Sequence, residues 1–405
     1  MSKGPRPVLS VEEAQAHILS TVRVLDAERV ALLEGADRIL AQAVTADRDI
    51  PPLTNSAMDG FALRGEDIAA GERKFRVVGE VAAGHQASVE VGPGEAVRIM
   101  TGAPVPPGAD TIVRFERTRS ENDSVVVLDS PSVGSNVRQA GEDVCAGQEV
   151  LRPGQLLRPQ EVGMLAAVGQ LQVSVIRRPR VAILGTGDEV VAPDQMPGPS
   201  QIRDANSYAV AAQVRRYGGL PMLLGVAHDE EEVVRQGMRQ ALERGADLLI
   251  TSGGVSVGDF DLIKQVMDAE GQMHFWSLNM KPGRPMAFGE VGGIPLLGLP
   301  GNPVAAMIST RLYARPALLK MQGHQDWSER TIKARLAEPI GRKDGRRHYL
   351  RVYLRETESG PEATLTGDQG SGILNSLVQA DGLAVIPEDA RHLPAGSDVQ
   401  VILLE

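Results

Sequence analysis

The chain has 405 residues, a formal net charge of −10, and 42% hydrophobic and 23% charged residues, a composition typical of a globular protein with several domains. The acidic balance argues against nonspecific binding to nucleic acid or membranes, and 3% aromatic residues provide few platforms for base stacking. A single cysteine, Cys145, excludes an intrachain disulfide framework. The start lacks the apolar core of a signal peptide, and no run approaches the ~20 apolar residues of a membrane helix, so we expect a cytoplasmic protein.

The first predicted elements are a helix and then a β-rich region. Ser10 and Glu13 have the spacing of a capping box, and SVEEAQAHILSTV carries apolar residues at helical spacing. Between 51 and 142, short β-branched runs such as FRVVGEV and DTIVRF are broken by Gly and Pro, which predicts a small β domain. A helix and a strand are predicted to follow. We therefore expect the β domain to be inserted into a discontinuous N-terminal domain of residues 1–50 and 143–178.

From Pro179 onward, apolar runs alternate with helical patterns. Four of these runs end in glycine or an acid: VAILGTGDE, PMLLGVAHD, ADLLITSGG and IPLLGLPGN. This alternation predicts βαβ units and a mostly parallel sheet over residues 179–328, whose ligand-binding edge holds all four loops. After these units the helices stop, which predicts a small C-terminal β barrel over residues 329–405. The expected fold class is a multidomain α/β protein.

The loop TSGGVSVGDFD, residues 251–261, carries the strongest chemical signal. A strand-to-helix turn with Asp261 as N-cap explains one acid and one glycine, but the loop has three glycines, two serines and two acids. Its N–H groups would suit a phosphate, and Asp259 and Asp261 would suit a hydrated Mg²⁺. The candidate phosphate-binding residues here are Ser252, Gly253, Gly254, Ser256, Gly258 and Asp259.

Two other loops of this edge carry acids. In VAHDEEEVV, Asp229 and Glu232 form a good capping pair for a helix, and taken alone that interpretation is favoured. Asp229 gains weight because it lies at the same sheet edge as Asp261. In LGTGDEVV, Asp188 and Glu189 are equally compatible with a turn and with a site.

Cations and a helix start complete the edge. KPGRPMAFG presents Lys281 and Arg284 on a loop stiffened by prolines, which indicates an oxyanion clamp, with a solvated charged turn as the alternative. LPGNPVAAM has Asn302 as N-cap before a proline, a helix start that is also suited to an anion. Arg351 lies in a strand-like run, and in the absence of another signal we expect its side chain to be exposed on that strand.

Three further polar residues lie in Gly- and Pro-rich stretches. Asp59 is in NSAMDGFA, Thr101 is in VRIMTGAPVPPGAD, and Ser371 is in the turn GDQGSGI. Nothing in their spacing names a reaction. The residues alone therefore predict a Mg²⁺-assisted reaction on a phosphorylated substrate, at an acidic, Gly-rich edge with cations nearby.

Seven motifs in order, NSAMDGFA, RIMTGAPVPPGAD, GEDVCAGQ, GTGDEVV, TSGGVSVGDFD, KPGRP and GLPGNPVA, closely resemble the molybdopterin molybdotransferase (MoeA) family, which includes the gephyrin E domain. The resemblance covers most of the chain. It implies a cytoplasmic homodimer, an N-terminal dimerisation domain, and an α/β domain of molybdopterin-binding type. It also implies Mg²⁺-dependent insertion of molybdate into adenylated molybdopterin, with release of AMP.

The resemblance also assigns roles residue by residue. Asp229 and Asp261 match the acids around the Mg²⁺ and the adenylyl phosphate. The residues that match the molybdate pocket are Lys281, Arg284, Pro285, Arg351 and Ser371. The residues that match other polar positions of the active cleft are Asp59, Thr101, Asp143 and Glu189, of which the first two would come from the partner subunit.

Arg284 departs from the family pattern, in which a second lysine usually follows Lys-Pro-Gly. Arginine offers a planar fork in place of a compact ammonium, so we expect altered affinity for molybdate or altered selectivity over tungstate. Two other functions stay open, a molybdopterin adenylyltransferase and a non-catalytic molybdopterin scaffold or carrier. Transient contacts with the adenylyltransferase and with apo-molybdoenzymes are further expectations.

Overall fold

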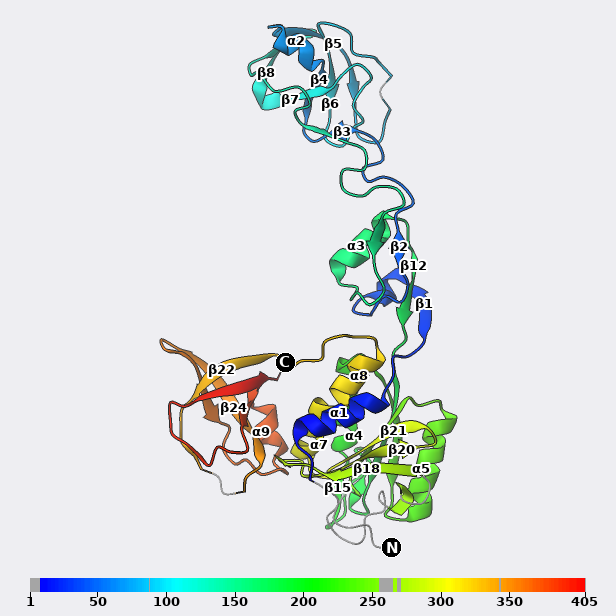
Figure 1. Ribbon diagram of the computed structural model, residues 1–405, viewed down its shortest axis with the longest axis vertical. Coiled ribbons are helices and arrows are strands. Elements are labelled where there is room, and N and C mark those ends of the chain that lie inside the picture. Colours follow the sequence, from blue (N-terminus) through cyan, green and yellow to red (C-terminus); the bar gives the residue numbers. More distant parts are fainter. Residues whose placement is uncertain (1–7, 87, 255–264, 268–270, 342–343, 405) are drawn as a thin grey trace. The chain divides into compact units, whose positions relative to one another are not determined.

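The computed structural model describes residues 8–86, 88–254, 265–267, 271–341 and 344–404 (Figure 1). The chain forms two compact units, one of Met1–Glu28 with Val175–Glu405 and one of Arg29–Ser174. Within the described ranges, no helix is both long and apolar enough to cross a bilayer.

The unit Arg29–Ser174 is built around a six-stranded sheet with the strand order β7-β4-β6-β5-β9-β8. Its core contains Phe61, Leu63, Phe75 and Val125, all nearly inaccessible to solvent. This is the small β domain that the broken β-branched runs predicted. The elements from the start of this unit onward are β1 (Ala27–Ala31), η1 (Leu32–Gly35), β2 (Val44–Thr45), β3 (Asn55–Ser56), β4 (Gly60–Leu63), α2 (Gly65–Ala69), β5 (Lys74–Val81), β6 (Glu95–Ile99), β7 (Thr111–Arg114), η2 (Phe115–Arg117), β8 (Thr118–Glu121), β9 (Ser124–Val127), β10 (Val137–Arg138), β11 (Glu149–Leu151), α3 (Pro159–Ala167) and β12 (Gln172–Ile176).

The chain enters and leaves this β domain along paired strands. β3 pairs antiparallel with β10, β2 pairs antiparallel with β11, and β1 forms a two-stranded sheet with β12. Because the outgoing and returning segments hydrogen-bond to each other, the β domain lies between two strands of one connector. The insertion is therefore visible in the pairing, while the exact boundaries at residues 50 and 143 stay a prediction.

The second unit holds a six-stranded sheet with the order β16-β13-β17-β21-β20-β18. The first four strands pair in parallel, whereas β20 pairs antiparallel with both β21 and β18, which confirms the mostly parallel sheet. The elements are α1 (Val11–Thr21), β13 (Arg180–Thr186), β14 (Val190–Val191), β15 (Ile202–Arg203), α4 (Asn206–Arg216), β16 (Leu220–Ala227), α5 (Glu231–Glu243), β17 (Leu248–Ser252), β18 (Gly271–Ser277), β19 (Met280–Lys281), β20 (Pro285–Val291), β21 (Ile294–Leu299), α7 (Pro303–Ser309), the π-helical turn η3 (Thr310–Ala314) and α8 (Arg315–Met321).

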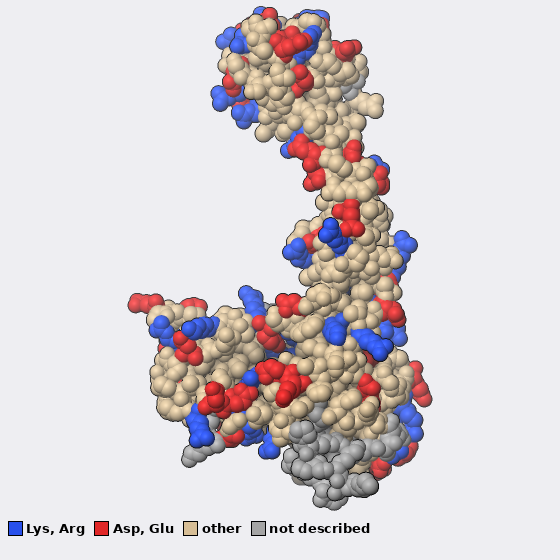
Figure 2. Space-filling model, in the orientation of Figure 1, with Lys and Arg blue, Asp and Glu red and all other residues tan. Residues whose placement is uncertain are grey.

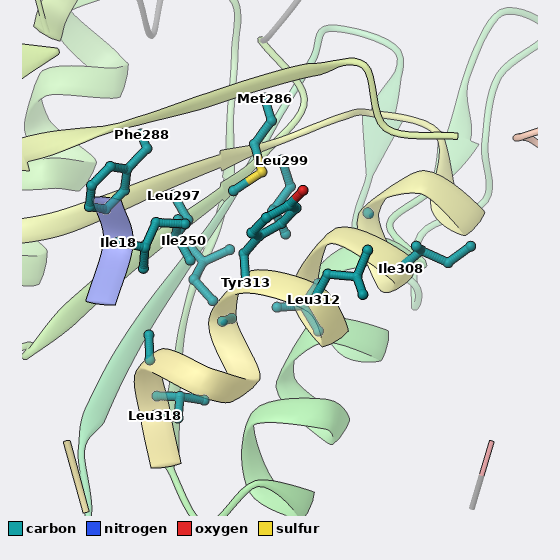
Figure 3. Close-up of a cluster of buried hydrophobic side chains, with 14 of the residues drawn as sticks. Ile18, Ile250, Met286, Phe288, Leu297, Leu299, Ile308, Leu312, Tyr313 and Leu318 are labelled. Carbon is teal, nitrogen blue, oxygen red and sulfur yellow. The ribbon is translucent and has the colours of Figure 1, made fainter. Parts of the chain in front are cut away.

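Both faces of this sheet are covered, so its central strands β13, β17 and β21 are largely apolar. Along β13, Val181 and Ile183 belong to a cluster with α1, α4, α7 and α8, whereas Ala182 and Leu184 face α5. Figure 1 shows α5 on the side of the sheet opposite α1 and α7. In Figure 3, Tyr313 and Leu312 of η3 point toward strand residues such as Leu299, which places the π-helical turn within the core.

The N-terminal helix α1 packs on this α/β core. The capping box at its start is confirmed, with the Ser10 hydroxyl accepting from the Glu13 amide. Val11, Ala14 and Ile18, spaced along one face, are buried in the same cluster as Leu318 of α8. Met1–Glu28 therefore groups with Val175–Glu405 by its contacts.

The C-terminal strands close into a barrel in the cyclic order β24-β25-β22-β28-β26, because β26 also pairs with β24. This confirms the small β barrel expected after the α/β units. The strand β19 pairs parallel to β24, with Lys281 opposite His348, so the KPGRP loop is attached to the barrel. The elements are β22 (Thr331–Leu336), β23 (Ile340–Gly341), β24 (Arg347–Thr357), β25 (Gly360–Leu365), α9 (Leu374–Val378), β26 (Gly382–Ile386), β27 (His392–Leu393) and β28 (Asp398–Leu403).

Replacing Ile18 tests the docking of α1. Ile18 is 1% exposed, so Ile18→Ala removes buried apolar surface, leaves a cavity and lowers the free energy of unfolding by roughly 2–5 kcal/mol. Val24, 51% exposed, is the control, and Val24→Ala changes the stability by no more than about 0.5 kcal/mol. Urea unfolding measures both, and equal effects of the two substitutions would contradict the packing of α1 on the core.

Candidate active site

Four loops meet at the carboxyl edge of the parallel sheet. The register places Thr186 of β13 opposite Ala227 of β16, and Ser252 of β17 opposite both Gly185 and Leu299. The four strands therefore end at the same level, and the loops that follow them are neighbours. This juxtaposition was predicted from the alternation of strands and helices.

The start of the Gly-rich loop is held against the neighbouring strand end. Ser252 is buried, and Gly253 has φ +94°, a conformation that favours glycine. A Cβ on Gly253 would lie 2.5 Å from the carbonyl oxygen of Thr186. Contact with the adjacent loop thus already explains this glycine. The remaining candidates of the loop, Ser256, Gly258, Asp259 and Asp261, lie outside the described residues.

The predicted capping pair of Asp229 and Glu232 is wrong. Helix α5 begins at Glu231, its N-cap residue is Glu230, and no side chain caps it. Glu232 instead pairs with Arg239 on the next turns of the helix. The reason is that the chain after β16 continues one residue beyond Asp229 before the helix is capped, so that Glu230 takes the N-cap position. The carboxylate of Asp229 is therefore not used by the helix start.

Asp229 lies among other acids at the sheet edge. Its backbone N–H donates to the Asp188 carboxylate at 3.0 Å. Partial burial, with the negative charges of Asp188 and Glu189, raises the pKa of the Asp229 carboxyl above its ordinary value. Glu189 folds back over Gly187, where a Cβ would lie 2.6 Å from its carboxylate oxygen. The carboxylates of Asp188 and Glu189 are thus near enough to Asp229 to disfavour its charged form, and a bound cation would relieve this repulsion.

Among the described residues, no group of three His, Cys, Asp or Glu side chains is arranged to hold a metal ion. The chemistry of the donor set nevertheless suits a hard cation, because Asp188, Glu189 and Asp229 offer carboxylate oxygens only. Mg²⁺ is bound in proteins through one or two carboxylates together with water and substrate phosphates. A site completed by a phosphorylated ligand therefore fits these residues.

A second cluster lines a cavity of about 600 Å³ between the α/β sheet and the barrel. It brings together residues from four separate segments that were predicted as site residues: Lys281, Arg284, Pro285, Asn302, Arg351 and Ser371. Acidic and basic side chains are interspersed over the face drawn in Figure 2. The cations that line the cavity are Lys281, Arg284, Arg346 and Arg351.

The default expectation that Arg351 is an exposed strand residue is wrong. Its side chain is fully buried, and burial lowers the pKa of its guanidinium. Nε donates to the Ser376 hydroxyl at 3.1 Å, and Nη2 donates to the carbonyls of Asp368 at 3.3 Å and Gly370 at 2.9 Å. Within the described ranges Nη1 donates no hydrogen bond. Arg351 thus anchors the turn that carries Ser371, and it lines the cavity.

The KPGRP loop, residues 281–285, packs against η3 and the end of α7. Gly283 has φ +104° and is buried, and a Cβ there would lie 2.9 Å from the Ser309 hydroxyl. The Tyr313 hydroxyl donates to Met280 Sδ at 3.2 Å. Lys281 and Arg284 themselves are exposed. A rigid base with two exposed cations at the cavity is the arrangement that an oxyanion clamp needs.

Asn302 is the N-cap residue of α7, as predicted, but its side chain makes no capping hydrogen bond and lines the cavity. The Val304 amide in the first turn of α7 donates to the Ser371 carbonyl at 3.1 Å. That amide is therefore not available to an anion, whereas the sequence had indicated a helix start suited to one. Its bond instead holds the Ser371 turn beside Asn302.

Asp59, Thr101 and Asp143 belong to the other unit, Arg29–Ser174. The Thr101 amide and hydroxyl both donate to Oδ1 of Asp59, at 2.7 and 2.8 Å, and these bonds lower the pKa of the Asp59 carboxyl. Asp143 donates its backbone N–H to Ile50. The first two residues form one polar pair, while Asp143 lies in the connector to the β domain.

Sequence reasoning missed several polar residues of the site. Arg346 and His348 line the cavity, and both contact Asp344. Asn206, at the start of α4, donates to Ser252 and Gly301. The available signal for Asn206 was its position directly before an apolar helical pattern, which also describes an ordinary helix start.

Most of the chain is similar to proteins of known families. Family models described as the MoeA N-terminal region (domain I and II), a probable molybdopterin binding domain and the MoeA C-terminal region (domain IV) match residues 9–169, 182–320 and 333–404. A molybdopterin molybdenumtransferase of Nostoc sp. is 37% identical, covering 98% of this chain and 94% of that protein. A Mycobacterium tuberculosis protein, molybdopterin molybdenumtransferase 2, is 36% identical, covering 97% and 98%. Two solved structures of a molybdopterin biosynthesis MoeA protein from Pyrococcus horikoshii have TM-scores of 0.85 and 0.81 at 31% and 32% identity, covering 98% of this chain and 100% of each.

Neutralising Asp229 tests the repulsion among the acids. Because the folded-state pKa of Asp229 is raised, its ionised form lowers stability at pH 7, and this penalty disappears as the pH falls below the ordinary carboxyl value of about 4. Asp229→Asn therefore raises the melting temperature at pH 7 in the absence of metal, and the difference from wild type vanishes in acid. Mg²⁺ stabilises the wild type more than the variant.

Thermal scans from pH 3.5 to 8 measure this difference, with and without Mg²⁺. Glu243→Gln, at the exposed end of α5, is the matched control and shows no such pH-dependent gain. A variant that is less stable than wild type at pH 7 without metal would contradict the repulsion.

Proposed function

The chain belongs to the MoeA family and is an enzyme of molybdenum cofactor biosynthesis, a molybdopterin molybdenumtransferase; from this premise we propose that it inserts molybdate into adenylated molybdopterin with Mg²⁺-dependent release of AMP. The observation that carries the proposal is the cavity shared by Lys281, Arg284, Arg351 and Ser371. It lies next to the loops at the carboxyl edge of the sheet, since Pro300 and Asn302 from the loop after β21 form part of its wall.

The cations of the cavity would offset the repulsion between the two anionic substrates of this reaction. Molybdate is a dianion, and its co-substrate already carries phosphates. Unit charges 4 Å apart repel by ~4 kcal/mol at an effective dielectric of 20. Lys281 and Arg284 at the cavity, with Arg351, offset this repulsion, and the Ser371 hydroxyl adds a neutral donor.

The acids at the sheet edge would bind the metal ion and so act on the adenylyl phosphate. Asp229, with Asp188 and Glu189 beside it, would hold Mg²⁺ together with Asp261, which lies outside the described residues. Bound Mg²⁺ would polarise the adenylyl phosphoanhydride and stabilise the leaving oxygen. Ser252 and the backbone of Gly253 and Gly254 would orient the phosphate at the strand end.

We also infer that the enzyme acts as a cytoplasmic homodimer, in which Asp59 and Thr101 of one subunit complete the cleft of the other. The support is their mutual hydrogen bonding in an exposed position of the β domain. Light scattering measures the number of subunits in the assembly.

The proposed function also implies two transient partners. An adenylyltransferase would supply the adenylated substrate, and apo-molybdoenzymes would receive the product.

AMP release from adenylated molybdopterin tests the function directly. Release by the wild type requires both molybdate and Mg²⁺ and yields a cofactor that activates an apo-molybdoenzyme. Ser371→Ala raises the molybdate concentration for half-maximal release by roughly tenfold, because one hydrogen bond to a charged ligand is lost. Ser359→Ala, in the exposed β24–β25 turn, leaves it unchanged.

Stoichiometric binding of adenylated molybdopterin without AMP release would reject the transferase mechanism and indicate a carrier. Release of pyrophosphate from ATP with molybdopterin would indicate an adenylyltransferase.

Arg284 provides a test of oxyanion selectivity. Because a guanidinium fork and an ammonium present different donor geometries to a tetrahedral oxyanion, Arg284→Lys changes the ratio of molybdate to tungstate affinity by roughly three- to tenfold. Titration of both oxyanions into wild type and variant measures the ratio. The control is Arg355→Lys, on the exposed part of β24, which leaves the ratio unchanged. Superimposable titration curves for wild type and Arg284→Lys would show that Arg284 does not determine oxyanion selectivity.

A further inference from the structure

Asn206 is a polar residue of the sheet edge to which the mechanism above gives no role. It is the first residue of α4, and its Nδ2 donates to the Ser252 hydroxyl oxygen at 2.8 Å and to the Gly301 carbonyl at 2.7 Å. A backbone carbonyl can only accept, so the amide nitrogen must face Gly301. The orientation of the Asn206 amide is therefore fixed by the loop after β21.

This orientation decides which way the Ser252 hydroxyl can point. Since Asn206 donates to Ser252 Oγ, the Ser252 proton cannot be directed at Asn206. Ser252 is 4% exposed, and within the described ranges its hydroxyl donates no hydrogen bond. A hydroxyl that accepts on one side and keeps its proton free is set as a donor, and a donor is what a phosphate oxygen requires.

Helix capping does not account for the Asn206 side chain. The first turn of α4 is served by Asp204, whose Oδ1 accepts from the Ser207 amide at 2.9 Å. The Asn206 amide donates its hydrogen bonds outside α4, to Ser252 at the end of β17 and to Gly301 in the loop after β21. These loops touch, since a Cβ on Gly301 would lie 3.6 Å from Gly253 Cα.

We propose that Asn206 is a positioning residue that, with its amide held by the Gly301 carbonyl, makes the Ser252 hydroxyl the donor to a phosphate oxygen of the nucleotide part of the substrate. This inference rests on the proposed function, because it requires an adenylyl phosphate at the strand end. Asn206 itself touches Ser252 and Gly301 and acts through the first of them.

The substitution Asn206→Asp reverses the polarity of the contact while keeping its shape. A carboxylate accepts the Ser252 proton and repels the Gly301 carbonyl, so the phosphate loses its donor. Asn206→Ala removes the contact without adding charge. Ser252→Ala removes the donor itself.

The experiment titrates AMP, in the presence of Mg²⁺, into the full-length protein by calorimetry. We expect Asn206→Asp and Ser252→Ala each to weaken AMP binding by roughly tenfold or more, as for loss of a hydrogen bond to a charged group. The double variant Asn206→Ala/Ser252→Ala binds AMP within about twofold of Ser252→Ala alone, because both residues act through one hydroxyl. The control Gln213→Ala removes another amide of α4, which donates to the Met307 carbonyl of α7, and leaves AMP affinity unchanged.

Thermal unfolding of each variant separates this role from a structural one. A structural role would lower the melting temperature and give additive losses of affinity in the double variant, and either additivity or normal AMP binding by Asn206→Asp overturns the inference. If only Ser252→Ala weakens binding, the inference fails while the proposed function stands. If wild type binds no AMP, the proposed function fails and the inference falls with it.

Discussion

The parallel pairing of β13, β16, β17 and β21 is the constraint on which the rest of the molecule depends. Parallel strands end at one edge, and backbone hydrogen bonds fix that Thr186, Ala227, Ser252 and Leu299 lie at the same level. The loops that follow can therefore carry acids, glycines or a helix start without losing their mutual positions. The sheet is held by helices on both faces, so its apolar strands have no other stable arrangement.

Opposite charges are separated along this edge. Asp188, Glu189 and Asp229 lie after β13 and β16, where burial and the neighbouring negative charges raise the pKa of Asp229. Lys281 and Arg284 come from the loop before β20, and Arg351 comes from the barrel. The pairing of β19 with β24 joins these two sources. The proposed function requires such a division, because a metal-bound phosphate needs carboxylates nearby whereas a free oxyanion needs cations.

Individual side chains show where sequence reasoning ends. The acids after β13 and β16 and the cations of KPGRP were found because charged residues in Gly- and Pro-rich loops stand out in a sequence. Arg351 was misjudged because its partners are carbonyls of Asp368 and Gly370 and a serine, Ser376, which carry no pattern. Asp229 was first interpreted as part of a helix cap because a shift of one residue in the helix start changes which acid serves it. Asn206 was overlooked because its partners are brought to it by two other strands.

The sequence by itself determined the order of the elements, the parallel sheet, the closed barrel and the family, since hydrophobic periodicity, turn residues and ordered motifs are local properties of the chain. It also placed the candidate loops on one edge, because parallel strands allow no other arrangement. Only the tertiary structure decided that Lys281, Arg284, Asn302, Arg351 and Ser371 line one cavity. It also decided that Arg351 is buried and that the Asn206 amide faces Gly301. These features depend on pairings between distant residues, such as Lys281 with His348, and on the hydrogen bonds that burial then requires, neither of which leaves a periodic signal in the sequence.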